Sequence, residues 1–193
     1  PDAPPPATGR RDDNPETPSN SIRLAQTLLS LVGGGGVNKV YDIDARLRPE
    51  GGNSVLAVSL EEYGRYLDTR AAGWERLAMI RARPVAGSCE LGDTIRGLLS
   101  GFVYEKPFDE GEVAKIRAIR AKAVEQSAKR HPGLVNVKSG AGGLSDITFI
   151  AQTYAVMYGR EHPAVRTRKT VDILRALGEE KLIDRGDARA LAD

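Results

Sequence analysis

Residues 37–53 read VNKVYDIDARLRPEGGN, and this stretch decides the fold of the first part of the chain. Its polar and apolar residues alternate, with a polar side (Asp42, Asp44, Arg46) and an apolar side (Tyr41, Ile43, Ala45, Leu47). A period of two predicts a β-strand over 37–47, because successive side chains of a strand point to opposite faces. Pro49–Asn53 ends it in a turn, and Val55–Val58 is a candidate for a short returning strand.

Helical patterns surround this predicted strand. Asn20 or Ser21 is the expected cap of a helix over 22–32, which ends at the four glycines 33–36. From Ser59 the apolar period becomes 3.6, and the capping box Ser59/Glu62 opens a helix that runs to Pro84 with Trp74 in the core. Further helices are expected at 90–100, 111–130, 145–158, 164–177 and 185–192. The fold class is therefore α+β but mostly helical, and the boundary falls near residue 58.

Composition excludes several classes of protein. The 193 residues have a net charge of only +2, which argues against a nucleic-acid binder. One cysteine and two histidines exclude a disulfide framework and a Cys/His zinc cluster. The sequence shows neither a membrane span nor a signal peptide, so we expect a cytoplasmic protein. Residues 1–20 hold six of the eleven prolines and are expected to form a flexible lead-in. Because the chain begins at Pro1 rather than Met, we expect a piece of a longer protein.

The polar side of the predicted strand has two interpretations. It is either a solvated face, or a site where a carboxylate holds Mg²⁺ and arginines bind phosphate oxygens bidentately. Asp44 supplies one such carboxylate, but phosphoryl transfer with two metals needs two or three. Asp12 and Asp13, the acids upstream, lie in the predicted lead-in. Arg81 and Arg83, at the end of the helix before Pro84, present the same choice between phosphate binding and an ordinary surface position.

Three blocks, in order, resemble glutamine synthetase adenylyltransferases of the DNA polymerase β-like nucleotidyltransferase superfamily. They are YDIDARLRPEG at 41–51, WERLAMIRARPVAG at 74–87, and VKSGAGGLSDI at 137–147 followed by Phe149 and Gln152. The likeness extends over about residues 21–185, nearly the whole structured chain.

The resemblance implies an enzyme that transfers AMP from ATP to a tyrosine of glutamine synthetase, or removes it by phosphorolysis, and so regulates nitrogen assimilation. It implies Mg²⁺ and ATP as cofactors, and glutamine synthetase and a PII signalling protein as partners. Asp44 matches the third metal carboxylate of the catalytic palm, and Arg46, Arg48 and Lys138 are candidate nucleotide or phosphate ligands. Residues 21–58 are then the end of a palm and 59–193 a helical domain. The first two carboxylates are missing, so this chain is expected to be inactive alone.

Two points stay open at this stage. Thr148 stands where the family usually has Glu. We interpret the Gly142–Asp146 block as mainly structural, with Ser145 as the cap of the helix that begins there. Alternatively, Lys138 and the glycine turn face a nucleotide cleft. The 73–79 and 102–109 segments favour the deadenylylating half over the adenylylating half without deciding it. The competing hypothesis for the whole chain is a helical regulatory module that binds PII or glutamine synthetase without catalysis.

Overall fold

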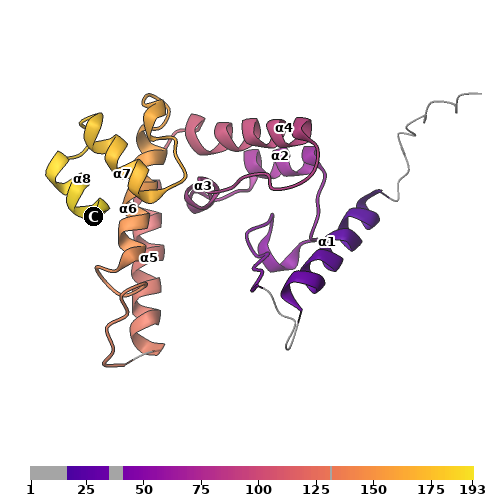
Figure 1. The fold of residues 1–193 in the computed structure, drawn as a ribbon, viewed down its shortest axis with the longest axis horizontal. Coiled ribbons are helices and arrows are strands. Elements are labelled where there is room, and N and C mark those ends of the chain that lie inside the picture. The colour runs from indigo at the N-terminus through magenta and orange to yellow at the C-terminus, as the bar shows by residue number, and fades with distance from the viewer. Residues whose placement is uncertain (1–16, 35–40, 131) are drawn as a thin grey trace, which may run out of the picture. The chain divides into compact units, whose positions relative to one another are not determined.

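The structure, a computed structural model, describes residues 17–34, 41–130 and 132–193, with the backbone alone at 17–19. The chain divides into two compact units, residues 1–69 (unit 1) and 70–193 (unit 2), and Figure 1 colours both along the sequence. Most of the predicted lead-in lies outside the described residues. The helical domain predicted from residue 59 remains a proposal.

Unit 1 contains helices α1 (Thr17–Gly33) and α2 (Leu60–Thr69), with a single 3-10 turn, η2 (Gly51–Asn53), between them. α1 begins before the predicted caps Asn20 and Ser21 and ends at the first glycine of the run, as predicted. α2 opens as predicted, since the Ser59 hydroxyl accepts a hydrogen bond from the Glu62 amide at 3.1 Å.

The strand predicted over 37–47 is wrong in its described part. Residues 41–47 form no regular structure, and neither does 55–58; Val37–Val40 lie outside the described residues. A strand needs a neighbour to pair its amides and carbonyls, and no residue of the described ranges offers one. The Tyr41 amide instead donates to the Val32 carbonyl at the end of α1 (3.1 Å). The apolar side is uncovered as well, with Tyr41 68%, Ile43 41% and Leu47 45% exposed.

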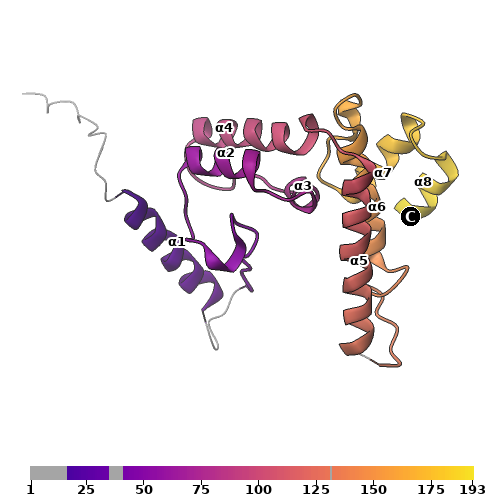
Figure 2. The ribbon, with the colours of Figure 1, turned by 180° about the vertical axis from the view of Figure 1, so that it is seen from behind.

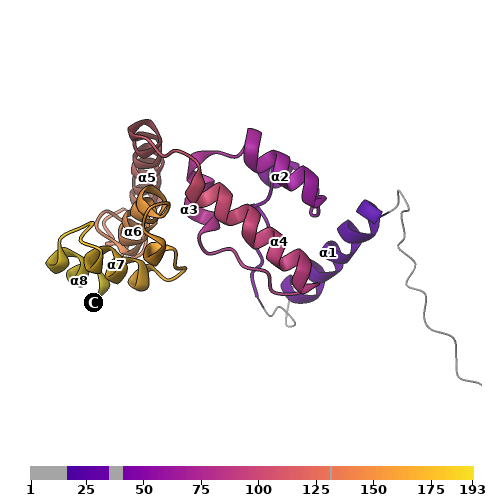
Figure 3. The ribbon, with the colours of Figure 1, turned by 90° about the horizontal axis from the view of Figure 1, so that it is seen from above.

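The regular elements of unit 2 are all helices and helical turns among its described residues, which confirms the mostly helical part of the predicted fold class. Its elements are α3 (Gly73–Met79), α4 (Cys89–Ser100), the π-helical turn η3 (Gly101–Glu105), α5 (Glu110–Arg130), α6 (Leu144–Tyr158), the 3-10 turn η4 (Pro163–Val165), α7 (Thr170–Glu179) and α8 (Arg185–Ala192). α7 packs on both α6 and α8, and α3 contacts α5, α6 and η3, as can be followed in Figures 2 and 3.

The core of unit 2 is built from aliphatic side chains of α6 and α7 and from the η3 turn. Ile173, Leu174 and Leu177 of α7 are fully buried, and each such burial stabilises the fold by about 1.5–3 kcal/mol. η3 continues α4 directly and buries Phe102, Val103 and Tyr104 in succession. A wider π turn brings these three neighbouring residues inside together.

Three helical details differ from the sequence predictions. The helix expected from 59 to 83 is interrupted at 70–72, because the Glu75 carboxylate accepts the Ala72 amide (2.8 Å) and starts α3 afresh. Trp74, expected in the core, lies in the first turn of α3 and is 44% exposed. The helix expected from 164 begins only at Thr170, since Arg166 has a non-helical backbone and its guanidinium donates to the Gly159 carbonyl (2.6 Å).

Candidate functional site

The two charged residues Asp44 and Arg46 form a bidentate ion pair in unit 1. Arg46 Nε lies 2.9 Å from Asp44 Oδ1, and its terminal nitrogen lies 2.6 Å from Oδ2. The backbone amide of Arg46 also donates to Oδ1, at 3.0 Å. Both side chains are open to solvent, with Arg46 82% and Asp44 58% exposed. The structure therefore brings together two of the four predicted site residues.

This pairing changes the acidity of the Asp44 carboxyl. Hydrogen bonds from the Arg46 side chain and then from its backbone amide lower the pKa of Asp44 to about 2. The same carboxylate raises the pKa of Arg46. A donor that stabilises the charged form of an acid favours loss of its proton. Asp44 is thus a carboxylate throughout the physiological pH range.

Arg48, the third predicted residue, holds its own loop. Its guanidinium donates to the carbonyls of Ala45 (2.5 Å), Gly52 (3.2 Å) and Ser54 (3.0 and 3.2 Å). These bonds close the 45–54 loop, in which Glu50 and Gly51 have positive φ angles of 58° and 60°. A phosphate role for Arg48, which remains a proposal, requires the guanidinium to leave these carbonyls.

Lys138, the fourth predicted residue, lies in unit 2 within the loop that leads to α6. Its side chain is exposed, while its backbone is held: the Lys138 amide donates to Asn136 Oδ1 (3.1 Å), and the Ser145 amide donates to the Lys138 carbonyl (2.9 Å). Gly143, rather than Ser145 as predicted, is the N-cap of α6, since Leu144 already has helical geometry.

Arg120 of α5 organises the whole Asn136–Asp146 loop. Its side chain is only 10% exposed, and Nε donates to Asp146 Oδ1 at 2.5 Å. Its other nitrogens donate to the carbonyls of Ser139 (3.0 Å) and Gly140 (2.8 Å). The second oxygen of Asp146 accepts the Gly142 amide (2.7 Å), and the Arg120 hydrogen bond lowers the pKa of Asp146. These contacts support the structural interpretation of this block.

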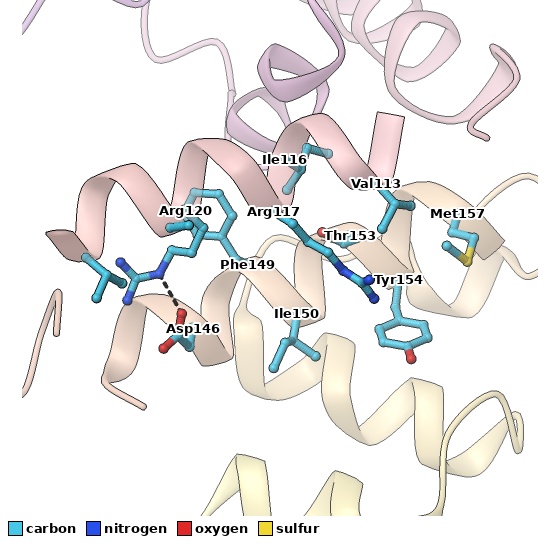
Figure 4. A pocket seen from close by; sticks show the side chains of 12 residues that line it. Val113, Ile116, Arg117, Arg120, Asp146, Phe149, Ile150, Thr153, Tyr154 and Met157 are labelled. Carbon is cyan, nitrogen blue, oxygen red and sulfur yellow. Dashed lines mark hydrogen bonds and ion pairs between the residues drawn. The ribbon is translucent and has the colours of Figure 1, made fainter. Parts of the chain in front are cut away.

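The Arg120–Asp146 pair closes one end of an apolar groove between α5 and α6. Figure 4 shows this groove, whose volume is about 450 Å³. Phe149, Ile150, Tyr154 and Met157 of α6 face Val113, Ile116 and Arg117 of α5 across it. Aliphatic and aromatic side chains make up most of its lining, and the charged groups among them are Arg117, Arg120 and Asp146.

The described residues do not by themselves form a magnesium site. Asp44 is one carboxylate with both oxygens engaged by Arg46, and the described ranges contain no group of three His, Cys, Asp or Glu side chains placed to hold a metal ion. A divalent cation at Asp44 thus needs further ligands and a displaced Arg46. In the same ranges, no helix is long and apolar enough to cross a lipid bilayer.

Sequence reasoning missed two buried arginines, Arg76 and Arg120. Arg76 is only 4% exposed and donates to the carbonyls of Val103, Lys106 and Pro107 at 2.8–3.1 Å. Burial lowers the pKa of Arg76, with nearby Glu112 opposing the effect. The sequence offered one indication of burial for each arginine. Arg76 stands beside Leu77, on the inward side of α3, and Arg120 follows Ile116 by four residues, which places both on the same side of a helix.

Comparison with known proteins identifies two matching families. Residues 4–97 match the model of glutamate-ammonia ligase adenylyltransferase, and residues 115–193 match that of the GlnD PII-uridylyltransferase. A bifunctional glutamine synthetase adenylyltransferase/adenylyl-removing enzyme of Rhizobium meliloti is 36% identical over 95% of this chain. Its counterparts from Cutibacterium acnes and Agrobacterium fabrum are each 35% identical, over 82% and 93% of the chain.

The aligned region is a small part of those relatives. It spans 19%, 16% and 18% of their respective lengths. The blocks at 41–51 and 74–87, which carry the resemblance in the sequence, lie inside the region matched by the first family model. The chain therefore belongs to the glutamine synthetase adenylyltransferase family, and it spans less than a fifth of the length of the relatives named above.

Proposed function

We propose that this chain is part of a cytoplasmic enzyme that moves AMP between ATP and a tyrosine of glutamine synthetase, in either direction, and so regulates nitrogen assimilation. The observation that carries this proposal is the sequence identity of 31–36% to enzymes named for adenylyl transfer and adenylyl removal. The match of residues 4–97 to the family model of glutamate-ammonia ligase adenylyltransferase agrees with it.

Asp44 is the residue to which we assign the chemistry. It is exposed, ionised at neutral pH and fixed in orientation by four hydrogen bonds from Arg46. In the complete enzyme, which uses Mg²⁺ and ATP, Asp44 supplies one metal ligand and residues 21–58 form the end of the palm. Arg46 and Arg48 are the candidate phosphate ligands of unit 1, and Lys138 is a separate candidate in unit 2.

The 193-residue chain alone is expected to be inactive. One carboxylate cannot hold the ions of a nucleotidyltransferase site, because two-metal chemistry needs ligands that converge from several segments. Purified chain should therefore show no Mg²⁺-dependent transfer of AMP to glutamine synthetase. Robust transfer by this chain would contradict the proposal that it is one part of a larger active site.

Asp44→Asn in the longer enzyme that contains this chain tests the assignment. The substitution keeps size and hydrogen bonding but removes the charge, so the rate should fall by orders of magnitude in the half that Asp44 serves; metal-mediated charge stabilisation is worth several kcal/mol. Asp42→Asn, at an exposed position two residues away, is the matched control. Adenylylation and deadenylylation rates and both melting temperatures are measured. Equal, small losses for the two variants would refute the role of Asp44.

The second candidate function is a helical module that binds PII or glutamine synthetase without catalysis. It is favoured by the match of residues 115–193, which include α6, α7 and α8, to the PII-uridylyltransferase model. Calorimetric titration of the 193-residue chain with purified PII and with glutamine synthetase tests it. Tight binding, combined with full activity of the Asp44→Asn enzyme, would favour the module over the catalytic part.

A further inference from the structure

Cationic side chains from two distant segments of unit 2 meet in one surface depression. Arg81 and Arg83 follow α3, whereas Arg168, Lys169 and Thr170 lead into α7. These five residues line a depression of about 540 Å³. Four of them are cations, and the lining contains no carboxylate and no aromatic ring.

A direct hydrogen bond joins the two segments. The Arg81 guanidinium donates to Thr170 Oγ1 at 2.9 Å, across 89 positions of sequence. This bond fixes the two halves of the depression relative to each other. The site is thus built by the tertiary fold of unit 2 and is not a local run of basic residues.

The four cations are not neutralised by the described part of the chain. Arg81, Arg83, Arg168 and Lys169 make no ion pair with any described carboxylate, whereas Arg96, Lys115, Lys129 and Arg166 of the same unit each make one. Like charges that lie close together repel one another, and a bound anion would offset this electrostatic repulsion.

The start of α7 adds to the positive potential. The N-terminus of a helix carries a partial positive charge, so cations there are unfavourable. Lys169 nevertheless occupies the N-cap position, with Arg168 before it, and its side chain caps no amide. Asp172 is the acidic residue of the first turn, and it does not line the depression.

We propose that this depression binds a chain of two or more phosphate groups. A terminal phosphate group carries close to two negative charges at neutral pH and each internal group of the chain carries one, so a chain of two or three groups carries about three to five, comparable to the four cations. Guanidinium groups bind phosphate oxygens bidentately. The lining contains no ring that could stack on a base, so the phosphate chain is the part of the ligand that these five residues contact. The source is a free polyphosphate or a nucleotide, and the proposal does not depend on AMP transfer.

Calorimetric titration of the 193-residue chain with tripolyphosphate, in metal-free buffer of about 0.1 M ionic strength, where charges more than about 10 Å apart are largely screened, tests the proposal. The expected result is saturable one-to-one binding, tighter than that of inorganic phosphate by about tenfold, since additional charge-assisted contacts form. Absence of binding, or equal affinity for inorganic phosphate, would overturn it.

The variant Arg83→Gln/Lys169→Gln locates the site. Neither side chain makes a hydrogen bond or an ion pair with a described residue, so the fold should be retained. A thermal melt followed by circular dichroism checks this. The affinity for tripolyphosphate should fall at least about tenfold. The control Arg96→Gln/Lys129→Gln removes the same charge elsewhere in unit 2 and should lose less than about twofold, because distant charges act only through the screened field. Equal losses in the two variants would reduce the effect to net charge and refute a site.

Competition then identifies the source of the phosphate chain. ATP that displaces tripolyphosphate with about tenfold higher affinity points to a nucleotide, and equal affinity points to recognition of the phosphate chain alone. Both results support the site. Displacement by adenosine would contradict it, since adenosine carries no phosphate.

Discussion

Replacing Arg120 with Met should destabilise unit 2 by removing the centre of the Asn136–Asp146 loop. Methionine preserves much of the apolar stem but none of the donors. The carbonyls of Ser139 and Gly140 lose their guanidinium partners, and Asp146 loses the closer of its two charge-stabilising contacts. The loop would then be held to α5 through the Ser127 hydroxyl, which contacts the side chains of Asn136 and Ser139.

The expected loss can be worked from these contacts. A buried acceptor left without a partner costs about 1–3 kcal/mol. The two carbonyls are part-buried and the Asp146 side chain is 29% exposed, so each falls at the low end of this range. Because the Gly140 carbonyl keeps the Gly143 amide as a donor at 3.2 Å, two full losses remain, and they give about 2 kcal/mol for Arg120→Met.

Tryptophan fluorescence offers a direct assay for unit 2. The chain has a single tryptophan, Trp74, which lies in α3 of that unit. Urea unfolding followed by its emission therefore reports unit 2 separately from unit 1. Arg117→Met, one helical turn earlier on α5 and at an exposed position, is the control and should change the free energy of unfolding by less than about 0.5 kcal/mol.

The pH dependence of the free energy of unfolding provides a second test of the role of Arg120. The pKa of Asp146 is lowered below its ordinary value in the folded chain, chiefly by the hydrogen bond from Arg120. A lowered pKa contributes stability above the unfolded value and loses it as the pH falls through the folded value. The gap between wild type and Arg120→Met should therefore shrink below about pH 4. Equal unfolding midpoints for the Arg120 and Arg117 variants at neutral pH would refute this account.

Two further predictions follow from glycine packing and from the Asp44 ion pair. Gly178→Ala should destabilise unit 2 by about 1–3 kcal/mol in urea unfolding, because the added methyl meets the Ala188 methyl of α8 at 2.7 Å. The control Gly97→Ala, with open space around it, should leave the free energy of unfolding unchanged or raise it. A decrease of similar size in both variants would contradict the close packing of α7 on α8. In an NMR titration, the Asp44 carboxyl should have a pKa of about 2 that returns toward 3.8 in Arg46→Gln; an Asp44 pKa unaffected by that change would disprove the pairing.

The sequence predicted the helices well where the apolar period was strong. α4, α5, α6 and α8 lie within a residue of their expected bounds, since each combines a 3.6-residue period with clear end signals. The break at 70–72 was missed because the Glu75 side chain, rather than a glycine or proline, restarts the helix. Trp74 was misassigned because periodicity was carried across that break.

Tertiary pairing explains the remaining differences. The alternation at 40–47 is genuine in the sequence, but a strand depends on a partner that local pattern cannot supply. Asp44 and Arg46 were predicted to share one face of a strand, whereas they meet through a contact within a segment that has no regular structure. The roles of Arg48, Arg76 and Arg120 depend on carbonyls of irregular loops, which no residue pattern marks in advance.

The π-helical turn η3 has a consequence for insertions and deletions. A π turn arises when a helix accommodates one additional residue, so Gly101–Glu105 is the place where α4 can lose a residue and regain α-helical winding. That loss rotates every later side chain of the segment by about 100°. Phe102, Val103 and Tyr104 could then no longer all face inward, and the carbonyl of Val103 would turn away from the Arg76 guanidinium. The length of this short segment is therefore as constrained as its composition.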